Sequence, residues 1–178
     1  MKYTTDWLIT QTNVDYLFFW GHRPSRDGSI IKTCMSQWWP SEFTENNVLY
    51  KTAEHYMMAQ KALLFNDHEI FERILQKESP KDVKDLGRQI RNFNLEIWDQ
   101  HKFQLVKQGN VLKFSQNEQL KHFLKQTKNK VLVEASPVDK IWGIGLTEDD
   151  ANAHNPIAWK GENLLGFALM EVRDQLNE

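Results

Sequence analysis

Helix-start signals dominate the middle of this chain and limit what it can fold into. Five residues of the types that cap a first helical turn each stand just before an apolar-periodic stretch: Thr52, Asp67, Ser79, Asn94 and Ser115. The pattern predicts helices over 53–66, from 68 to the Ser-Pro step at 79–80, from 80 to about 91, over 95–109, and after Ser115. Gly109 serves as the expected C-terminal stop of the fourth. Residues 164–176 form one further amphipathic helix.

Strand signals are fewer and lie outside this region. Residues 15–20 are mostly apolar and rich in aromatic side chains, residues 30–39 lead up to Pro40, and residues 130–135 are dominated by β-branched side chains. Together with the helices they predict a helix-rich α+β fold with a few short strands. No repeat and no Gly- or Pro-rich linker divides the chain, so we expect a single domain over residues 1–178.

Composition excludes several classes of protein. The 22 basic and 24 acidic residues give a net charge of −2, which argues against a polycation that coats nucleic acid but leaves room for a local basic pocket. No apolar run approaches the ~20 residues of a membrane span, and the N-terminal residues lack the apolar core of a secretory signal. The single cysteine, Cys34, permits no intrachain disulfide and is expected to be a small buried or half-buried side chain. We expect a cytoplasmic protein with no membrane association, and predict no particular oligomeric state.

The helix that follows Thr52 carries the first candidate site. Glu54, Met58 and Lys61 share one helical face, and Glu54 lies in the first turn, where the helix dipole favours a negative charge. An ionised carboxylate there suits the stabilisation of a developing cation, or attack on it. The alternative is a first-turn glutamate that only complements the dipole on a solvated face.

A second candidate region follows the strand predicted near residue 132. The strand leads into a loop that carries Glu134, Asp139, Trp142 and Gly143. Loops behind strand ends are common positions for functional groups, and carboxylates, a flat ring and glycine together suit a ligand-binding loop. The alternative is a proline turn with a core tryptophan.

Cationic and anion-binding groups are expected in two further places. Residues 159–166 form a Gly-rich approach to the last helix, where free backbone N–H groups would bind an anion and Asn163 would add a donor. The alternative for Asn163 is a simple helix cap. Arg88 contributes a cation and Trp98 a flat ring; the alternatives are a solvated face and a core side chain.

Metal and cofactor chemistry finds no support in the sequence. The six histidines (22, 55, 68, 101, 122 and 154) have no partners at metal-ligand spacing. No dinucleotide fingerprint and no phosphate-binding Walker motif occurs. We therefore expect no metal and no cofactor.

Several stretches, in this order, resemble the NADAR family. They are residues 35–43, 50–62, 86–88, 109–117, 133–145 and 159–166, accompanied by Phe93 and Trp98. The combination of Glu54-His55-Tyr56 with the Ser-Pro-x-Asp-x-x-Trp-Gly stretch at 136–143 is the most specific part. The resemblance extends over roughly residues 16–176, nearly the whole chain.

This resemblance implies an enzyme that cleaves N-glycosidic bonds. Members of the family resemble hydrolases of phosphoribosylamino-pyrimidine intermediates of riboflavin synthesis, or remove ADP-ribose from modified guanine. Carried over by motif, Glu54 is the catalytic carboxylate, and Trp98, Asp139, Trp142 and Asn163 are pocket residues. The chemistry fits, because breaking a ribose C1′–N bond builds positive charge on the sugar, which a carboxylate stabilises.

The remaining groups receive roles from the same chemistry. Asp139 or a bound water would protonate the departing base, and Trp98 or Trp142 would stack on it. Lys61, Arg88 or the helix start near Asn163 would hold phosphate. The expected partner is a small ribosyl phosphate or ADP-ribose-type molecule, with ADP-ribosylated nucleic acid as a further option. The alternative function is a module that binds ADP-ribose without turnover.

Overall fold

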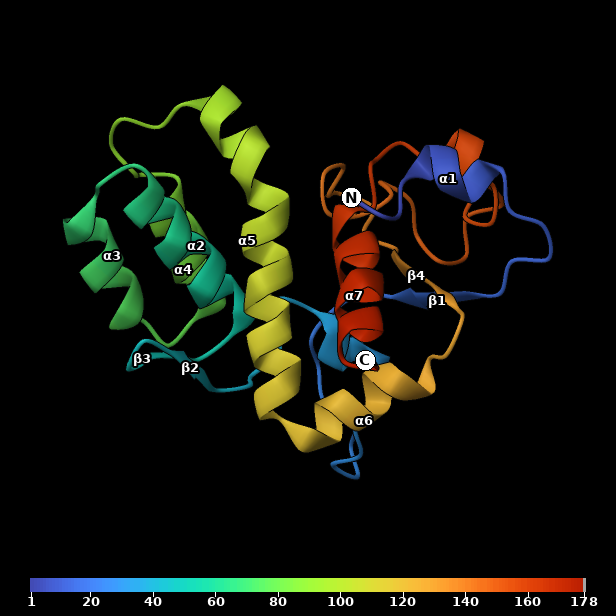
Figure 1. The fold of residues 1–178 in the computed structure, drawn as a ribbon, viewed down its shortest axis with the longest axis horizontal. Coiled ribbons are helices and arrows are strands. Elements are labelled where there is room, and N and C mark those ends of the chain that lie inside the picture. Colours follow the sequence, from blue (N-terminus) through green and yellow to red (C-terminus); the bar gives the residue numbers. More distant parts are fainter. Residues whose placement is uncertain (178) are drawn as a thin grey trace. The chain divides into compact units, whose positions relative to one another are not determined.

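The computed structural model describes residues 1–177, which form two compact units (Figure 1). The central unit consists of Gln37–Glu118. The terminal unit combines Met1–Ser36 with the segment that begins at Gln119. Each unit has its own packing, and the candidate residues are divided between them.

Four capped helices build most of the central unit: α2 (Ala53–Leu64), α3 (His68–Leu75), α4 (Pro80–Gly87) and α5 (Leu95–Gln116). The side chains of Thr52, Asp67, Ser79 and Asn94 accept hydrogen bonds from first-turn backbone N–H groups of these helices, as predicted. The helix α2 packs against the other three, and its residues 53–59 are all buried. The start of α2 is therefore enclosed by protein.

The helix α5 is longer than predicted. It passes through Gly109 and ends at Gln116, and α6 (Glu118–Gln126) begins after Asn117. The helix cap predicted at Ser115 is therefore wrong, because Ser115 lies inside α5 and its hydroxyl donates to Leu112 O. A Cβ atom at Gly109 would lie 2.6 Å from Cδ1 of Tyr56 on α2. The glycine is thus a point of close helix–helix approach and not a C-terminal stop.

A hairpin that precedes α2 has no counterpart among the predicted strands. Strands β2 (Phe43–Glu45) and β3 (Val48–Tyr50) pair antiparallel around Asn46 and Asn47. Both asparagines have positive φ, 51° and 63°. Two left-handed residues form the turn type that joins hairpin strands, and asparagine tolerates this conformation.

The terminal unit is organised around two parallel strands and one buried helix. Strand β1 (Tyr16–Phe19) pairs with β4 (Val131–Glu134) in the register Tyr16↔Val131 to Phe19↔Glu134. The helix α7 (Leu164–Gln175) packs on β4, and its residues 164–173 are all buried. The two strands and the bounds of α7 confirm the sequence expectation for these segments. The expected amphipathic character of α7 is wrong, because residues 164–173 have no exposed face. The short helices α1 (Thr5–Ile9) and η2 (Pro156–Ala158) complete the unit.

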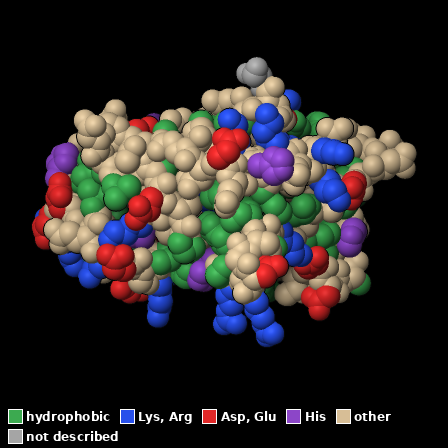
Figure 2. Space-filling model, turned by 90° about the horizontal axis from the view of Figure 1, so that it is seen from below, with side chains coloured by type: hydrophobic (Ala, Val, Ile, Leu, Met, Phe, Trp, Pro, Cys, Tyr) green, Lys and Arg blue, Asp and Glu red, His purple; other side chains and the backbone are tan. Residues whose placement is uncertain are grey.

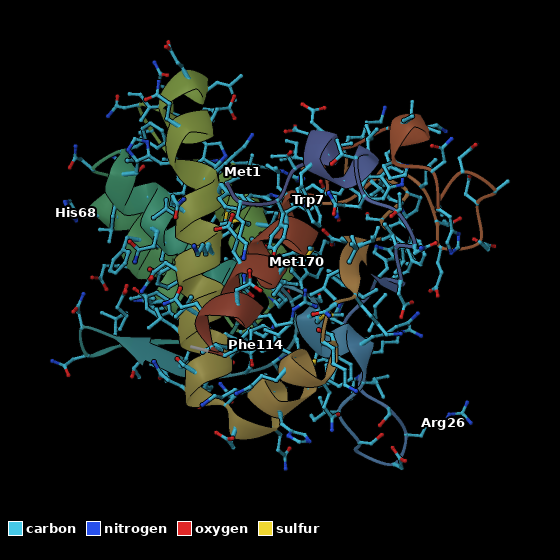
Figure 3. All side chains as sticks on the ribbon, turned by 45° about the vertical axis from the view of Figure 1, so that its right-hand side comes forward. Met1, Trp7, Arg26, His68, Phe114 and Met170 are labelled. Carbon is cyan, nitrogen blue, oxygen red and sulfur yellow. The ribbon has the colours of Figure 1, made fainter. Side chains whose placement is uncertain are left out.

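The strand expected within residues 30–39 is replaced by a short 3-10 helix, η1 (Lys32–Met35). Its backbone N–H groups bond locally: Cys34 N donates to Ile31 O at 2.9 Å and Ser36 N donates to Thr33 O at 3.1 Å. Cys34 itself is fully buried, as expected. In the loop between β1 and η1, Arg26 extends away from its surroundings (Figure 3).

None of the helices within residues 1–177 combines the length and the apolarity that crossing a bilayer requires. On the face shown in Figure 2, Lys and Arg side chains alternate with Asp and Glu and form no continuous basic surface. The surface view agrees with the near balance of charge in the sequence.

Candidate active site

Glu54 occupies the first turn of α2 and is buried. The residue is 3 % exposed, and its Oε1 atom is not in contact with solvent. The backbone N–H of Glu54 donates to the carbonyl oxygen of Gln37 at 2.9 Å, which fixes the helix start against the preceding segment. The alternative of a dipole-complementing glutamate on a solvated face is therefore wrong.

Lys61 lies two helical turns after Glu54 and is held in place by its surroundings. Its Nζ donates to the carbonyl oxygen of Gly87 at 2.9 Å and lies 4.3 Å from the ring centre of Phe93 and 5.4 Å from that of Trp98. Burial lowers the pKa of Lys61 below its ordinary value, and the charge of Glu54 opposes this shift. The carboxylate and the ammonium therefore interact electrostatically within one unit.

Of the other two central-unit candidates, only Trp98 joins this group. Trp98 is half-buried and lies beside the ammonium of Lys61. The Arg88 side chain is 69 % exposed and pairs with Asp85 at 2.9 Å, on the surface of α4. The structure thus brings together Glu54, Lys61 and Trp98 and leaves Arg88 outside the group.

His55, next to Glu54, has a structural role. It is 1 % exposed, and its Nε2 lies 3.1 Å from the carbonyl oxygen of Lys77. A carbonyl only accepts, so Nε2 carries the proton, and Nδ1 accepts from the Thr52 hydroxyl at 2.8 Å. The Thr52 oxygen in turn accepts from the His55 backbone N–H. The neutral imidazole thereby locks the cap of α2.

This arrangement predicts a pH-dependent loss of stability. Burial lowers the pKa of His55 below its ordinary value of 6.5, with the charge of Lys51 adding to the shift and the Lys77 carbonyl opposing it. The unfolded chain then binds a proton that the folded chain excludes, so stability falls as the pH drops below 6.5, by at most about 1.4 kcal/mol per pH unit. We expect the unfolding free energy of wild type to decrease between pH 6.5 and 5.

Chemical denaturation across this range measures the effect. The variant His55→Gln should be less stable at pH 7.5 and should show a flatter pH profile. The control His68→Gln, at an exposed position on α3, should retain the wild-type slope. Equal slopes for wild type and His55→Gln would refute the assignment.

In the terminal unit, Asn163 and Glu134 are joined through the backbone of β4. Asn163 is fully buried and adopts a left-handed conformation, with φ 54°. Its Oδ1 accepts from the Glu134 backbone N–H at 2.9 Å, and its Nδ2 donates to Leu132 O at 2.9 Å. Asn163 occupies the cap position of α7, yet its amide is used to hold the end of β4.

Asp139 organises the loop that follows β4. Its Oδ1 accepts from the backbone N–H groups of Ile141 at 2.9 Å and Trp142 at 2.8 Å. Gly143 lies where the loop folds back on the strand: a Cβ there would be 2.8 Å from Glu134 O and 3.1 Å from Asp139 O. The predicted loop residues Glu134, Asp139, Trp142 and Gly143 thus form one tightly held loop.

The expected anion site at the start of α7 is wrong. The backbone N–H groups of Asn163, Leu164 and Leu165 donate to the carbonyls of Gly143, Ile141 and Trp142 at 3.1, 3.2 and 3.1 Å. These N–H groups bind the loop to the helix, so they are not available to donate hydrogen bonds to an anion. No group of three or more His, Cys, Asp and Glu side chains within residues 1–177 is arranged to hold a metal ion.

Two buried amide residues connected to the start of α2, Gln37 and Asn110, are not among the predicted site residues. They lie 73 positions apart, and no local pattern connects them. Both lie inside stretches that carry the family resemblance, 35–43 and 109–117. That resemblance is the sequence signal that could have identified them.

Comparison with known proteins assigns the class. The NADAR domain profile matches residues 18–177, so it spans both compact units. An N-glycosidase of Acanthamoeba polyphaga mimivirus is 48 % identical over 165 residues, which cover 90 % of this chain and 95 % of the viral protein. N-glycosidase YbiA of Escherichia coli K12 is 34 % identical over 127 residues, covering 71 % of each chain.

A solved structure agrees. The NMR structure of E. coli YbiA superposes with a TM-score of 0.73 at 28 % identity, covering 95 % of this chain and 89 % of the other. Helix-rich α+β architecture with few short strands is thus shared. This chain belongs to the NADAR family.

Proposed function

We propose that this protein is a hydrolase that cleaves the bond between C1′ of a ribose and a nitrogen of a base. The enzyme class follows from the family and from relatives that are named N-glycosidases. The proposed substrates are a phosphoribosylamino-pyrimidine or an ADP-ribosyl-guanine adduct. The observation that carries the proposal is the buried Glu54 carboxylate at the start of α2, with the Lys61 ammonium on the same face.

The reaction needs one carboxylate beside the anomeric carbon. The C1′–N bond breaks with its electron pair passing to nitrogen, the oxygen of water bonds to C1′, and a proton of that water ends on the departing base. Positive charge develops on the sugar in between. Glu54 stabilises it, because a carboxylate in a water-poor site interacts strongly with a nearby cation.

Lys61 and Trp98 bind the two ends of such a substrate. Lys61 uses one donor on Gly87 O and has two more for a phosphate oxygen. The half-buried ring of Trp98 offers a stacking face for a base. For the terminal unit, the roles predicted from the sequence stay proposals. They are a catalytic role for Asp139 and substrate binding by Trp142, with Glu134, Gly143 and Asn163 shaping the loop that carries them.

Release of free base tests the proposal directly. Wild-type protein is incubated with a phosphoribosylamino-pyrimidine and with ADP-ribosylated guanosine, and the products are separated by chromatography. We expect free base and the free ribosyl phosphate or ADP-ribose in equal amounts from one of the two. If ADP-ribose binds in calorimetry while neither substrate is cleaved, the protein is a binding module and the enzyme proposal fails.

Loss of the Lys61 charge should weaken substrate binding. We expect Lys61→Met to raise KM about 10- to 100-fold, equivalent to about 1.4–2.8 kcal/mol, because a charge-assisted bond to phosphate is lost. Lys61→Arg should recover part of the affinity. Steady-state kinetics measures both, and Lys81→Met, at an exposed position on α4, is the control. An unchanged KM in Lys61→Met would remove Lys61 from the site.

A further inference from the structure

Two buried amide side chains border the start of α2. Asn110 on α5 is fully buried, and Gln37 is 7 % exposed. The Nδ2 of Asn110 donates to Gln37 Oε1 at 2.8 Å and to Val106 O at 2.8 Å. Two acceptors on one amino group fix which way the Asn110 amide faces.

Two sets of contacts connect the pair to α2. Gly109 lets α5 approach the ring of Tyr56 on α2 closely, which brings its neighbour Asn110 to the same region. The backbone carbonyl oxygen of Gln37 accepts a hydrogen bond from the backbone N–H of Glu54, at 2.9 Å. Gln37 is therefore attached on one side to the residue proposed to face C1′ and on the other to α5.

The hydrogen bonding of the pair is incomplete in a way that points to a ligand. Within residues 1–177, the Oδ1 atom of Asn110 is buried and accepts no hydrogen bond. A buried acceptor left in this state is costly, and Asn110 bears the cost because its amino group serves two acceptors at once. The hydrogen bond from Asn110 Nδ2 holds the Oε1 atom of Gln37 in place. The Nε2 amino group of Gln37 is then the part of that amide able to donate to a ligand.

We propose that Gln37 is a substrate-positioning residue whose Nε2 donates to the 2′-hydroxyl of the ribose, and that Asn110 holds Gln37 in this orientation. The inference rests on the proposed function, which sets C1′ beside Glu54. The 2′-hydroxyl is the substituent on the carbon next to C1′, and a hydrogen bond to it strengthens as the sugar becomes cationic. The site would thereby select ribosyl over 2′-deoxyribosyl substrates.

Binding of two sugar phosphates tests this without requiring turnover. Calorimetry compares ribose 5-phosphate with 2-deoxyribose 5-phosphate, and we expect wild type to bind the former about tenfold more tightly. In Gln37→Met, which keeps the side-chain length but has no donor, the ratio should fall to about one. Asn110→Asp should move the ratio in the same direction, because it replaces the donor to Gln37 with an acceptor.

Controls separate a lost contact from a lost fold. Gln104→Met, at an exposed position on α5, should keep the wild-type ratio, and melting curves establish that each variant is folded. If Asn110→Asp does not fold, Gln37→Leu, which can neither donate nor accept, provides a second variant, with an expected ratio of about one. A wild-type ratio near one, or a wild-type ratio retained by folded Gln37→Met, overturns the inference. Failure of the proposed function is distinct: wild type then releases no base, whatever the ratio.

Discussion

Glu54→Gln should reduce kcat by about 10³-fold, a loss of about 4 kcal/mol of transition-state stabilisation. The substitution keeps the size of the side chain and removes its charge. Because Glu54 is 3 % exposed, bulk water would not replace the missing charge beside the sugar. KM should change much less than kcat, since the charge on the sugar develops only in the transition state. Single-turnover release of the base measures the effect.

A matched control exists in the same unit. Glu96 also lies in the first turn of a helix, α5, but it is exposed. Glu96→Gln removes the same charge from an equivalent helix position and should keep full activity. Equal rates for wild type and folded Glu54→Gln would show that the carboxylate has no part in the chemistry.

The second large effect concerns Gly166, where α7 meets β4. A Cβ atom there would lie 2.1 Å from the carbonyl oxygen of Leu132 and 2.6 Å from both amide atoms of Asn163. The obstructing groups are a strand backbone and a buried side chain that holds it, so neither can move away without separating helix from strand. We expect Gly166→Ala to destabilise the protein by about 3 kcal/mol or more.

Denaturant unfolding followed by circular dichroism measures this loss. Gly28→Ala is the comparison, because Gly28 has φ +78° but no heavy atom within 4 Å of an added Cβ. That variant bears only the conformational strain, about 1 kcal/mol. A loss in Gly166→Ala no larger than in Gly28→Ala would contradict the close packing of α7 on β4.

The caps show which parts of the fold a sequence can predict. The confirmed capping side chains each accept a hydrogen bond from an N–H group three residues further along, so a short stretch of sequence is enough to predict them. They are Thr52, Asp67, Ser79 and Asn94. The helix end expected at Gly109 is wrong because this glycine allows close packing against Tyr56, which lies on another helix. The anion site expected at α7 failed for the same reason: carbonyls from residues 141–143 reach its N–H groups from a distant loop.

The candidate site divides along the same line. The spacing of Glu54 and Lys61 on one face follows from helical periodicity, and the structure retains it. Other features of the site depend on which helices pack together. They are the burial of Glu54, the contacts of Lys61 with Gly87, Phe93 and Trp98, and the hydrogen bond between Gln37 and Asn110. No pattern within a single segment contains that information.

A crystal of Glu54→Gln soaked with the uncleaved substrate measures the central claim most directly. The account predicts that the side-chain oxygen of residue 54 lies within about 3.5 Å of C1′ on the face opposite or adjacent to the departing base. Phosphate should lie at Lys61 and the 2′-hydroxyl at Gln37. A sugar bound with C1′ remote from the start of α2, and facing another carboxylate, would contradict the account.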